Sequence, residues 1–427
     1  MSVLQENILT SLYNDASVYN GWDDAKRRIH LHPCHLRVID PLREPYAIVK
    51  YTKNESDFDQ ELTKTFRSVI VHKDTGNIVS IAPYKSVHDY SWLGVEDGNF
   101  QVQEFVDGTM MHVFRYQNNP IVISTRSNLG AKNKFYNYQY ETSPTFSDLL
   151  YDTGVDFESL MPQHDGASAT FISIVLQHPS NRIVVPVKKP NIHVIHYGYT
   201  KDGVVTMCHT KETIPSQFHQ FMPTSYDDPA ILKDGETSAI QYVENKGNTE
   251  GHNWQGIVIK NEKGVRYRLR SKEYTNVRLL RGNQANRIIR FLELRKEKKI
   301  KEYLTHYSEE SDLYFKYEGI IRTNTRYLFN LYHNVFCTHQ RQFSSLPAHF
   351  KKHVSHLHNV YKDSLKPQEK TITYEYVISY VNELDSTYSY FTLFKEAFDR
   401  LHPNVHNIPV DFKPSTEGLR NAPPLPE

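Results

Sequence analysis

Asp107 and Gly108 lie between two apolar segments and form the first place in the chain where residue types and spacing suggest chemistry. The apolar stretch Val102–Val106 precedes them, and a second apolar stretch reaches Phe114. Two such stretches around an Asp-Gly pair are typical of two strands joined at a turn. The sequence therefore predicts a turn that carries a carboxylate, and most other informative segments can be placed relative to it.

A run of basic residues between Arg281 and Lys301 is the second candidate. Eight Lys or Arg residues stand there against two Glu residues, a local excess of +6. Such a run suits the phosphate backbone of a nucleic acid, although a solvated helix face is the commoner reason for it. The formal net charge of the whole chain is only +1, so any attraction for nucleic acid must come from local clusters.

The overall composition limits the class of protein. A chain of 427 residues with 39% hydrophobic and 23% charged residues is expected to form two soluble globular domains. Cys34, Cys208 and Cys337 have no metal-ligand spacing, which favours a reducing compartment and argues against a disulfide scaffold or zinc site. No stretch approaches the roughly 18 apolar residues of a membrane span, and the N-terminus lacks a signal-peptide pattern, so we expect a cytoplasmic protein.

The first 281 residues are expected to form an α+β domain with antiparallel sheets. Residues 1–20 have the apolar spacing of a short helix, and turn residues at 74–77 and 262–264 predict hairpins. Neither strand-helix alternation nor a Gly-rich phosphate loop is present in the sequence. Short apolar runs predict strands at Ser68–Val71, Ile78–Ile81, Pro120–Ile123, Phe171–Leu176, Arg182–Val185 and Gly256–Ile259.

The remainder of the chain is expected to be helical. Apolar periodicity predicts an all-α domain over residues 282–401, with helices at 284–304, 313–336, 345–363 and 373–400. Residues 402–427 contain six prolines and few large apolar groups, so they are predicted to form an extended tail.

Seven short motifs, in order, give the first domain a family resemblance. Together they resemble the nucleotidyltransferase domain of the phage-type, tRNA-repair ATP-dependent RNA ligase family, which has an ATP-grasp-like fold and a helical C-terminal domain. The family pattern runs from a strand Arg through Pro-x-x-Lys, Glu-Lys-x-Asp-Gly-Ser, Thr-Lys/Arg-Gly-Ser, Phe-Glu-x-x-x-Pro-x-Asn-Arg-Ile-Val and Glu-Gly-x-Val to Lys-x-Lys-Ser. The matching segments are Phe66–Ile70, Ala82–Lys85, Glu104–Thr109, Ser124–Ser127, Ile174–Val184, Trp254–Lys260 and Arg268–Ser271. The helical part resembles the family less specifically, through Tyr314–Tyr317 and Arg326–His333.

The resemblance also shows what this chain lacks. The family's nucleophilic lysine attacks the α-phosphate of ATP, and its position is taken by Phe105, which has no lone pair to donate. Val175 and Gln255 stand where the family has carboxylates that serve the sugar and the metal. A register shifted by one residue would place Glu104 at the nucleophile's position, which is no better. We therefore expect no catalytic residue, no metal site and no required cofactor, with residual ATP binding still open.

The resemblance implies that a basic cleft persists. The residues expected to line it are Arg67, Lys85, Asp107, Gly108, Arg126, Gln255, Lys260, Arg268 and Arg270. Such a cleft would bind a nucleotide or an RNA phosphate without reacting, unless internal carboxylates neutralise the arginines.

Three hypotheses follow. The first is a catalytically inactive RNA-ligase-like protein that serves as a structural or binding component, with protein partners, in a virus particle or an RNA–protein assembly. The viral setting comes from the largely viral membership of the family. The second is a divergent ATP-dependent ligase with a displaced lysine, for which Lys85, Lys132 and Lys134 are candidates. The third is a non-catalytic RNA-binding module that uses the basic cleft and the helix at 281–301.

Overall fold

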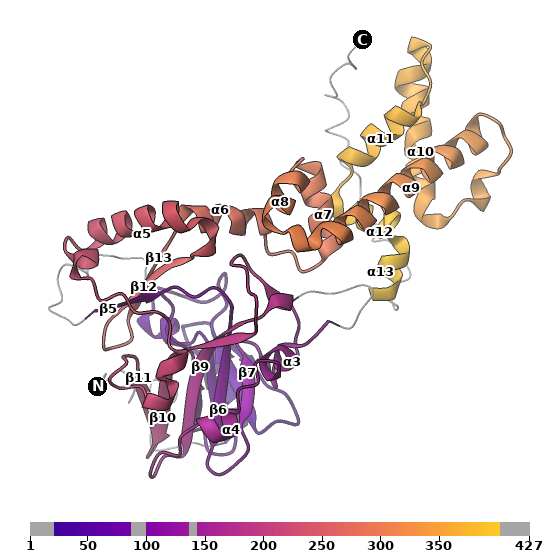
Figure 1. Ribbon diagram of the computed structural model, residues 1–427. Coiled ribbons are helices and arrows are strands. Elements are labelled where there is room, and N and C mark those ends of the chain that lie inside the picture. The colour runs from indigo at the N-terminus through magenta and orange to yellow at the C-terminus, as the bar shows by residue number, and fades with distance from the viewer. Residues whose placement is uncertain (1–20, 87–99, 136–142, 402–427) are drawn as a thin grey trace. The chain divides into compact units, whose positions relative to one another are not determined.

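The computed structural model describes residues 21–86, 100–135 and 143–401 (Figure 1). The chain divides into two compact units, Met1–Lys134 with Pro144–Arg281 and Phe135–Ser143 with Gly282–Glu427. The predicted helix at 1–20 and the predicted tail at 402–427 lie outside the described residues. Antiparallel sheets in the first unit and a helical second unit confirm the predicted α+β class with an all-helical C-terminal region.

Two antiparallel sheets share the main core of the first unit. Their strand orders are β1-β2-β3-β4 and β11-β10-β9-β6-β7-β8. Fully buried side chains from both sheets, such as Ile48, Ile70, Phe114 and Phe171, pack in one apolar cluster. The strands are β1 (Arg37–Ile39), β2 (Tyr46–Lys50), β3 (Val69–His72), β4 (Ile78–Ile81), β6 (Thr109–Tyr116), β7 (Val122–Thr125), β8 (Asn128–Leu129), β9 (Ala169–Gln177), β10 (Asn191–Lys201) and β11 (Val204–Cys208).

A third sheet, of order β13-β12-β5, provides one wall of the candidate site. It contains β5 (Gln101–Glu104), β12 (Gly256–Lys260) and β13 (Arg266–Arg270), all antiparallel. One face packs against α5 (Glu236–Glu250), where Ile257, Ile259, Tyr267 and Leu269 are buried. The other helices of this unit are α2 (Trp22–Leu31), α3 (Phe146–Tyr151), α4 (Phe157–Leu160) and α6 (Lys272–Arg281).

The strands predicted around Asp107 exist, but they do not pair with each other. β5 pairs with β12 in the third sheet, whereas β6 pairs with β7 and β9 in the six-stranded sheet. Residues 105–108 therefore connect two sheets, which places Asp107 at their junction.

One predicted strand of this unit is wrong. Arg182–Val185 forms a bend after the short 3-10 helix η4 (Pro179–Asn181). The backbone N–H groups of Val184 and Val185 in this bend donate hydrogen bonds to the Asp107 carboxylate. The hairpins predicted at 74–77 and 262–264 join β3 to β4 and β12 to β13.

The second unit is built from α7 to α13 around an aromatic core. The predicted helix at 313–336 is confirmed as α9 (Ser311–Phe336), which buries Tyr314, Tyr317 and Leu328 along one stripe. The predicted helix at 345–363 forms α10 (Ala348–Val360), followed by a π turn at Tyr361–Leu365. The remaining helices are α7 (Arg287–Lys296), α8 (Ile300–His306), α11 (Tyr374–Glu383), α12 (Ser386–Leu393) and α13 (Lys395–Leu401).

Two long predicted helices are interrupted in the structure. The helix predicted at 284–304 is split because Lys298 adopts a left-handed conformation with φ 58°. The helix predicted at 373–400 becomes three helices, since Asp385 caps α12 by accepting a hydrogen bond from the backbone N–H of Tyr388. Apolar periodicity continued across these breaks, and a periodic pattern alone does not reveal them. Among the described residues, none of the helices combines the length and the apolar character needed to cross a membrane.

Candidate functional site

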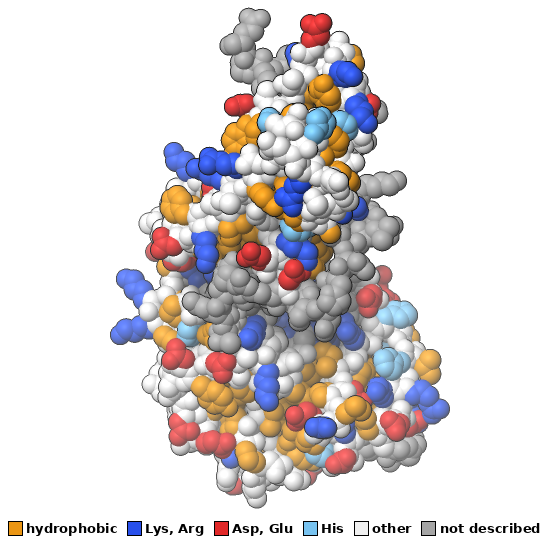
Figure 2. Space-filling model, turned by 90° about the vertical axis from the view of Figure 1, so that its right-hand side faces the viewer, with side chains coloured by type: hydrophobic (Ala, Val, Ile, Leu, Met, Phe, Trp, Pro, Cys, Tyr) orange, Lys and Arg blue, Asp and Glu red, His pale blue; other side chains and the backbone are white. Residues whose placement is uncertain are grey.

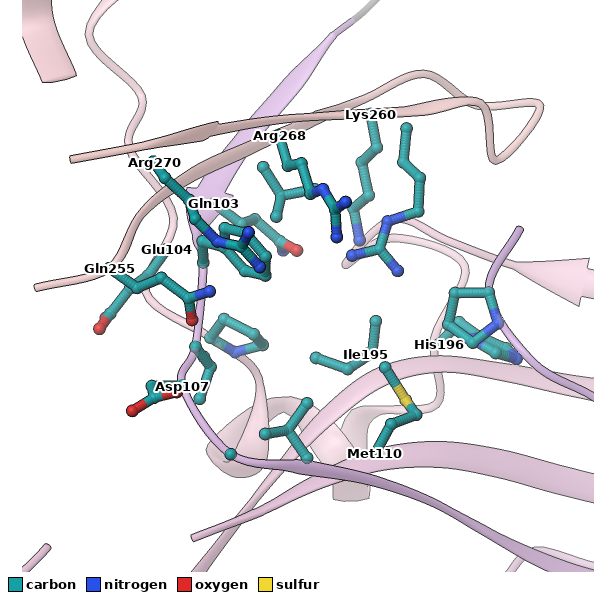
Figure 3. A pocket seen from close by; sticks show the side chains of 18 of the residues that line it. Gln103, Glu104, Asp107, Met110, Ile195, His196, Gln255, Lys260, Arg268 and Arg270 are labelled. Atoms are coloured by element: carbon teal, nitrogen blue, oxygen red, sulfur yellow. The ribbon is translucent and has the colours of Figure 1, made fainter. Parts of the chain in front are cut away.

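A cavity of about 250 Å³ in the first unit brings together most of the residues predicted from the sequence (Figure 3). It lies between the inner face of the third sheet and residues of β6, β9 and β10. The predicted residues that line it are Arg67, Asp107, Gly108, Gln255, Lys260, Arg268 and Arg270, together with Phe105 and Val175.

Strand alternation explains the charge of one cavity wall. Successive side chains of a strand point to opposite faces, so residues two apart share a face. On β13, Tyr267 and Leu269 pack against α5, while Arg266, Arg268 and Arg270 face the cavity. On β12, Val258 and Lys260 line the cavity opposite Arg268 and Arg266, their cross-strand partners. Figure 3 shows Arg268 and Lys260 reaching into the cavity from this wall.

Arg266 was missed by the motif-based prediction. Its side chain is 9% exposed and lines the cavity beside Lys260. The signal was present in the sequence, because Arg266, Arg268 and Arg270 alternate with apolar residues at the period of a strand. The matched motif begins at Arg268, so Arg266, two residues before it, was left out.

The opposite wall of the cavity is largely apolar. Met110 from β6, Val175 from β9 and Ile195 from β10 line it, and Figure 3 shows Met110 and Ile195 across from Lys260. Ile195 lies in an irregularity of β10, where the pairing register with β9 shifts between Val194 and His196. A bulge of this kind lets neighbouring residues reach the same side, which explains why Ile195 and His196 both line the cavity.

The basic side chains of the cavity are not neutralised by acidic ones. Within the described part of the chain, no ion pair involves Arg67, Lys260, Arg266, Arg268, Arg270 or Arg278. Lys260 is 6% exposed, and its Nζ has no hydrogen-bond partner among the described residues; the same holds for Nε and Nη1 of Arg266. The possibility that internal carboxylates satisfy these arginines is therefore not realised in the described structure.

Burial and repulsion between neighbouring cations lower the pKa values of the basic groups in the cavity. Burial, with the nearby charge of Arg266, lowers the pKa of Lys260 to about 7, although Glu212 opposes the shift. Burial, with the charges of Arg67 and Arg268, lowers the pKa of Arg266 to about 9. Burial also lowers the pKa of Arg270 to about 10. Each shift is the response expected when a cation is desolvated without an anion beside it.

The Asp107 carboxylate accepts hydrogen bonds from two other segments of the cavity wall. Its Oδ2 accepts hydrogen bonds from the backbone N–H groups of Val184 and Val185, both at 2.9 Å, and its Oδ1 accepts one from the Tyr274 hydroxyl at 2.7 Å. Figure 3 shows the carboxylate directed away from the cavity centre. Burial and the neighbouring Asp107 raise the pKa of Tyr274, so this phenol remains a donor. Asp107 thus joins β6, the bend at 182–185 and α6.

Gly108 is required by close packing beside Asp107. A Cβ added at this position would lie 2.5 Å from the Leu176 carbonyl oxygen and 2.6 Å from Cγ1 of Val175. Both atoms belong to β9, so a side chain at this point would push the sheet away from the junction. The Asp-Gly pair is therefore explained by structural needs as well as by the resemblance.

Phe105 occupies the side of the cavity where Arg270 lies. The Arg270 guanidinium is 5.0 Å from the centre of the Phe105 ring, a favourable cation–π distance. The Phe105 backbone N–H donates to the Gly256 carbonyl at 2.9 Å, which fixes the residue against β12. An apolar ring in contact with a guanidinium provides packing and no nucleophile.

The residues at the cavity do not fit a divalent metal ion. Val175 is apolar, Gln255 has a neutral amide, and both oxygens of Asp107 already accept hydrogen bonds. Glu104 is then the one remaining carboxylate in the described lining, and a single carboxylate does not make a divalent-metal site. Across the part of the chain that the structure describes, no group of three or more His, Cys, Asp and Glu side chains is arranged to hold a metal. We derive no metal-dependent step.

Lys85 and Arg126 are not among the residues that line the cavity. Lys85 lies over the Phe58 ring at 4.5 Å. Arg126 donates to the backbone carbonyls of Arg67 at 2.9 Å and Tyr51 at 3.0 Å, and it stacks on the Tyr51 ring. Arg126 therefore supports the segment that carries Arg67, a positioning contact that the sequence did not reveal.

The basic run between Arg281 and Lys301 is arranged differently. Four of its eight cations are paired with carboxylates on the same or neighbouring helices. The pairs are Arg287–Glu310, Arg290–Glu293, Arg295–Glu318 and Lys299–Glu297. Two of these carboxylates, Glu310 and Glu318, lie outside the run, so the pairs lower its local excess from +6 to +4.

Comparisons with known proteins give only distant matches. No protein-family model matches the chain, and no curated protein matches it. A solved structure of a proposed ATP-dependent DNA ligase from Aquifex aeolicus has 13% identity and a TM-score of 0.37, over 80% of each chain. Two solved structures of an archaeal ATP-dependent RNA ligase, described as form 2 and form 1, each have 10% identity. Their TM-scores are 0.36 over 65% of each chain and 0.37 over 69% of this chain and 75% of that one. At such scores, function has to be inferred from the pocket's own side chains.

Proposed function

We propose that this protein is a catalytically inactive member of the RNA-ligase-like nucleotidyltransferases that binds phosphate groups without forming a covalent nucleotide adduct. The observation that carries the proposal is the composition of the cavity. Six basic side chains line it, Phe105 packs against one of them, and the Asp107 carboxylate is consumed by structural hydrogen bonds. This arrangement attracts anions, and Val175 and Gln255 provide no carboxylate for metal-assisted transfer.

A role as a binding component of a larger assembly follows from this proposal. A protein that binds phosphate without turnover is suited to hold RNA or a nucleotide next to protein partners, in a virus particle or another RNA–protein assembly in the cytoplasm. The family resemblance supports the viral setting, and the unpaired cations support an RNA or nucleotide ligand.

A displaced lysine provides the second candidate function, and its best candidate is Lys260, which the sequence suggested as a cleft residue and not as a nucleophile. Lys85, Lys132 and Lys134 do not line the cavity, whereas Lys260 does, with a pKa of about 7 that leaves much of the amine neutral. In this reaction Nζ would bond to the α-phosphorus of ATP, pyrophosphate would leave, and the nitrogen would lose a proton. The absence of carboxylates at Val175 and Gln255 places this function second.

One experiment separates the two functions. The protein is incubated with ATP labelled at the α-phosphate and with Mg²⁺, then denatured and examined for covalently bound label. Our proposal expects no label on the wild-type protein, while the RNA affinity of the unlabelled protein falls as salt is raised. Label that is present on the wild type and absent from Lys260→Met would overturn the proposal in favour of the displaced lysine.

A further inference from the structure

The cationic and aromatic side chains at the two ends of the cavity differ in burial. Lys260, Arg266 and His209 line the inner end and are all buried, whereas Phe105 and Arg270 at the other end are partly exposed. Figure 3 shows the same division, with Lys260 on the side of His196 and Arg270 on the side of Gln255. A ligand that enters from the partly exposed end must therefore place its leading group against the buried cations.

Three cations converge at the inner end. Arg266 is the cross-strand partner of Lys260, and burial followed by the charge of Arg67 lowers the pKa of Arg266. His196 and His209 also line the cavity. Burial and then His209 lower the pKa of His196, and burial and then Lys260 lower the pKa of His209. Glu212 is the carboxylate that acts on Lys260 here, and its side chain is exposed.

The unsatisfied donors define what the leading group must offer. Lys260 Nζ and two N–H groups of Arg266 lack partners among the described residues, as does the Gln103 amide nitrogen on the same wall. A phosphate monoester offers three acceptor oxygens and up to two negative charges to such donors. A purine or pyrimidine offers only neutral acceptors and would leave buried cations without a counter-charge.

The size of the cavity points the same way. Its volume of about 250 Å³ lies below the roughly 300–1,000 Å³ of pockets that enclose most of a drug-sized ligand. A terminal phosphate with part of its sugar would occupy this space, while a whole nucleoside triphosphate would remain partly outside. The apolar wall of Met110, Val175 and Ile195 would then pack against the sugar.

We infer that the inner end of the cavity, formed by Arg67, Lys260 and Arg266, is a site for a phosphate monoester that enters phosphate first. This inference rests on the proposed phosphate-binding function and specifies its ligand and its orientation. The shared chemistry is the monoester group, and two sources provide it: the 5′ end of an RNA chain and a small soluble phosphate compound.

The test uses the full chain and two short RNA oligonucleotides of one sequence, one with a 5′-phosphate and one with a 5′-hydroxyl, each labelled at the 3′ end. Fluorescence anisotropy measures their affinities, with pyrophosphate and adenosine as competitors. The 5′-phosphate form should bind at least about tenfold more tightly, as expected for charge-assisted hydrogen bonds to buried donors. Pyrophosphate should compete, and adenosine should not.

Variants assign the effect to the inner end. Lys260→Met and Arg266→Met should each abolish the preference for the 5′-phosphate. Lys263→Met is the matched control, because Lys263 lies exposed in the turn between β12 and β13. The wild-type competition remains decisive even if a variant fails to fold.

Two outcomes would overturn the inference: equal affinity for both oligonucleotides, and competition by adenosine as strong as that by pyrophosphate. If pyrophosphate raises the melting temperature of the wild type and not of Arg266→Met, while neither oligonucleotide binds, the inference holds for a soluble phosphate compound. In that case the RNA ligand of the proposed function fails. A covalent adenylate on the protein would overturn the proposed function, but it would not contradict the inference that a phosphate monoester enters phosphate first.

Discussion

The two basic clusters of this protein look alike in sequence and differ in structure. The run from Arg281 to Lys301 is the denser one, yet four of its eight cations pair with carboxylates. The cations of β12 and β13 are fewer and stand among apolar residues, yet they share a buried cavity without an acidic partner. Figure 2 shows Lys and Arg interspersed with Asp and Glu on the surface, so charge density on its own does not mark a site.

The comparison has an energetic basis. A paired cation near the surface loses little solvation and gains little from its partner. A buried cation without a partner destabilises the unliganded fold, and a bound anion removes that cost. We therefore expect substitutions in the two clusters to change stability in opposite directions.

The largest effect is expected from breaking the most buried pair of the second unit. Arg287 lies 3.3 Å from Glu310, whose other carboxylate oxygen accepts from the Tyr303 hydroxyl. Arg287→Met should leave Glu310 buried without its counter-charge and lower the free energy of unfolding by about 3 kcal/mol. Urea unfolding followed by circular dichroism measures this loss.

The exposed pair Lys299–Glu297 provides the control for that change. Its side chains are 48% and 46% exposed, so Lys299→Met should alter stability by less than about 0.5 kcal/mol. Equal losses for the two variants would show that burial does not distinguish the pairs.

A gain of stability is expected in the cavity. Arg266→Met replaces a buried, unpaired guanidinium with an apolar side chain, which should raise the free energy of unfolding by about 1–2 kcal/mol in phosphate-free buffer. The gain should shrink when pyrophosphate is added, because only the wild type gains stability from the ligand. If Arg266→Met is less stable than the wild type in both buffers, the expectation that the two basic clusters respond in opposite directions is contradicted.

The smallest expected effect, counted per pH unit, is the pH dependence of stability that Lys260 contributes. Its pKa falls from 10.5 to about 7 on folding, so between these values the unfolded chain binds more protons than the folded chain. Unliganded wild-type stability should therefore rise relative to Lys260→Met by up to about 1.4 kcal/mol per pH unit from about pH 7 to about pH 10, and stay level below. Unfolding free energies of both proteins across this range measure the slope, and parallel curves would contradict an unpaired Lys260.

Local sequence determined much of the fold. Short apolar runs located β3, β4, β9 and β12, because a buried strand requires apolar residues over its own length. Periodicity located α9 for the same reason. The strand predicted at Arg182–Val185 was wrong because Asp107, distant in sequence, captures the backbone N–H groups of that segment.

The site was determined partly by sequence and partly by tertiary structure. The residue types at 105, 175 and 255 fix what chemistry is missing, since no folding can supply a side chain that the sequence lacks. Only the packed structure decided which cations lack a partner. Arg126 donates to backbone carbonyls and Lys85 lies over an aromatic ring, whereas Arg266 lies beside Lys260 in the cavity. Charge is a property of a residue, whereas the cost of burying it depends on neighbours that only the fold brings together.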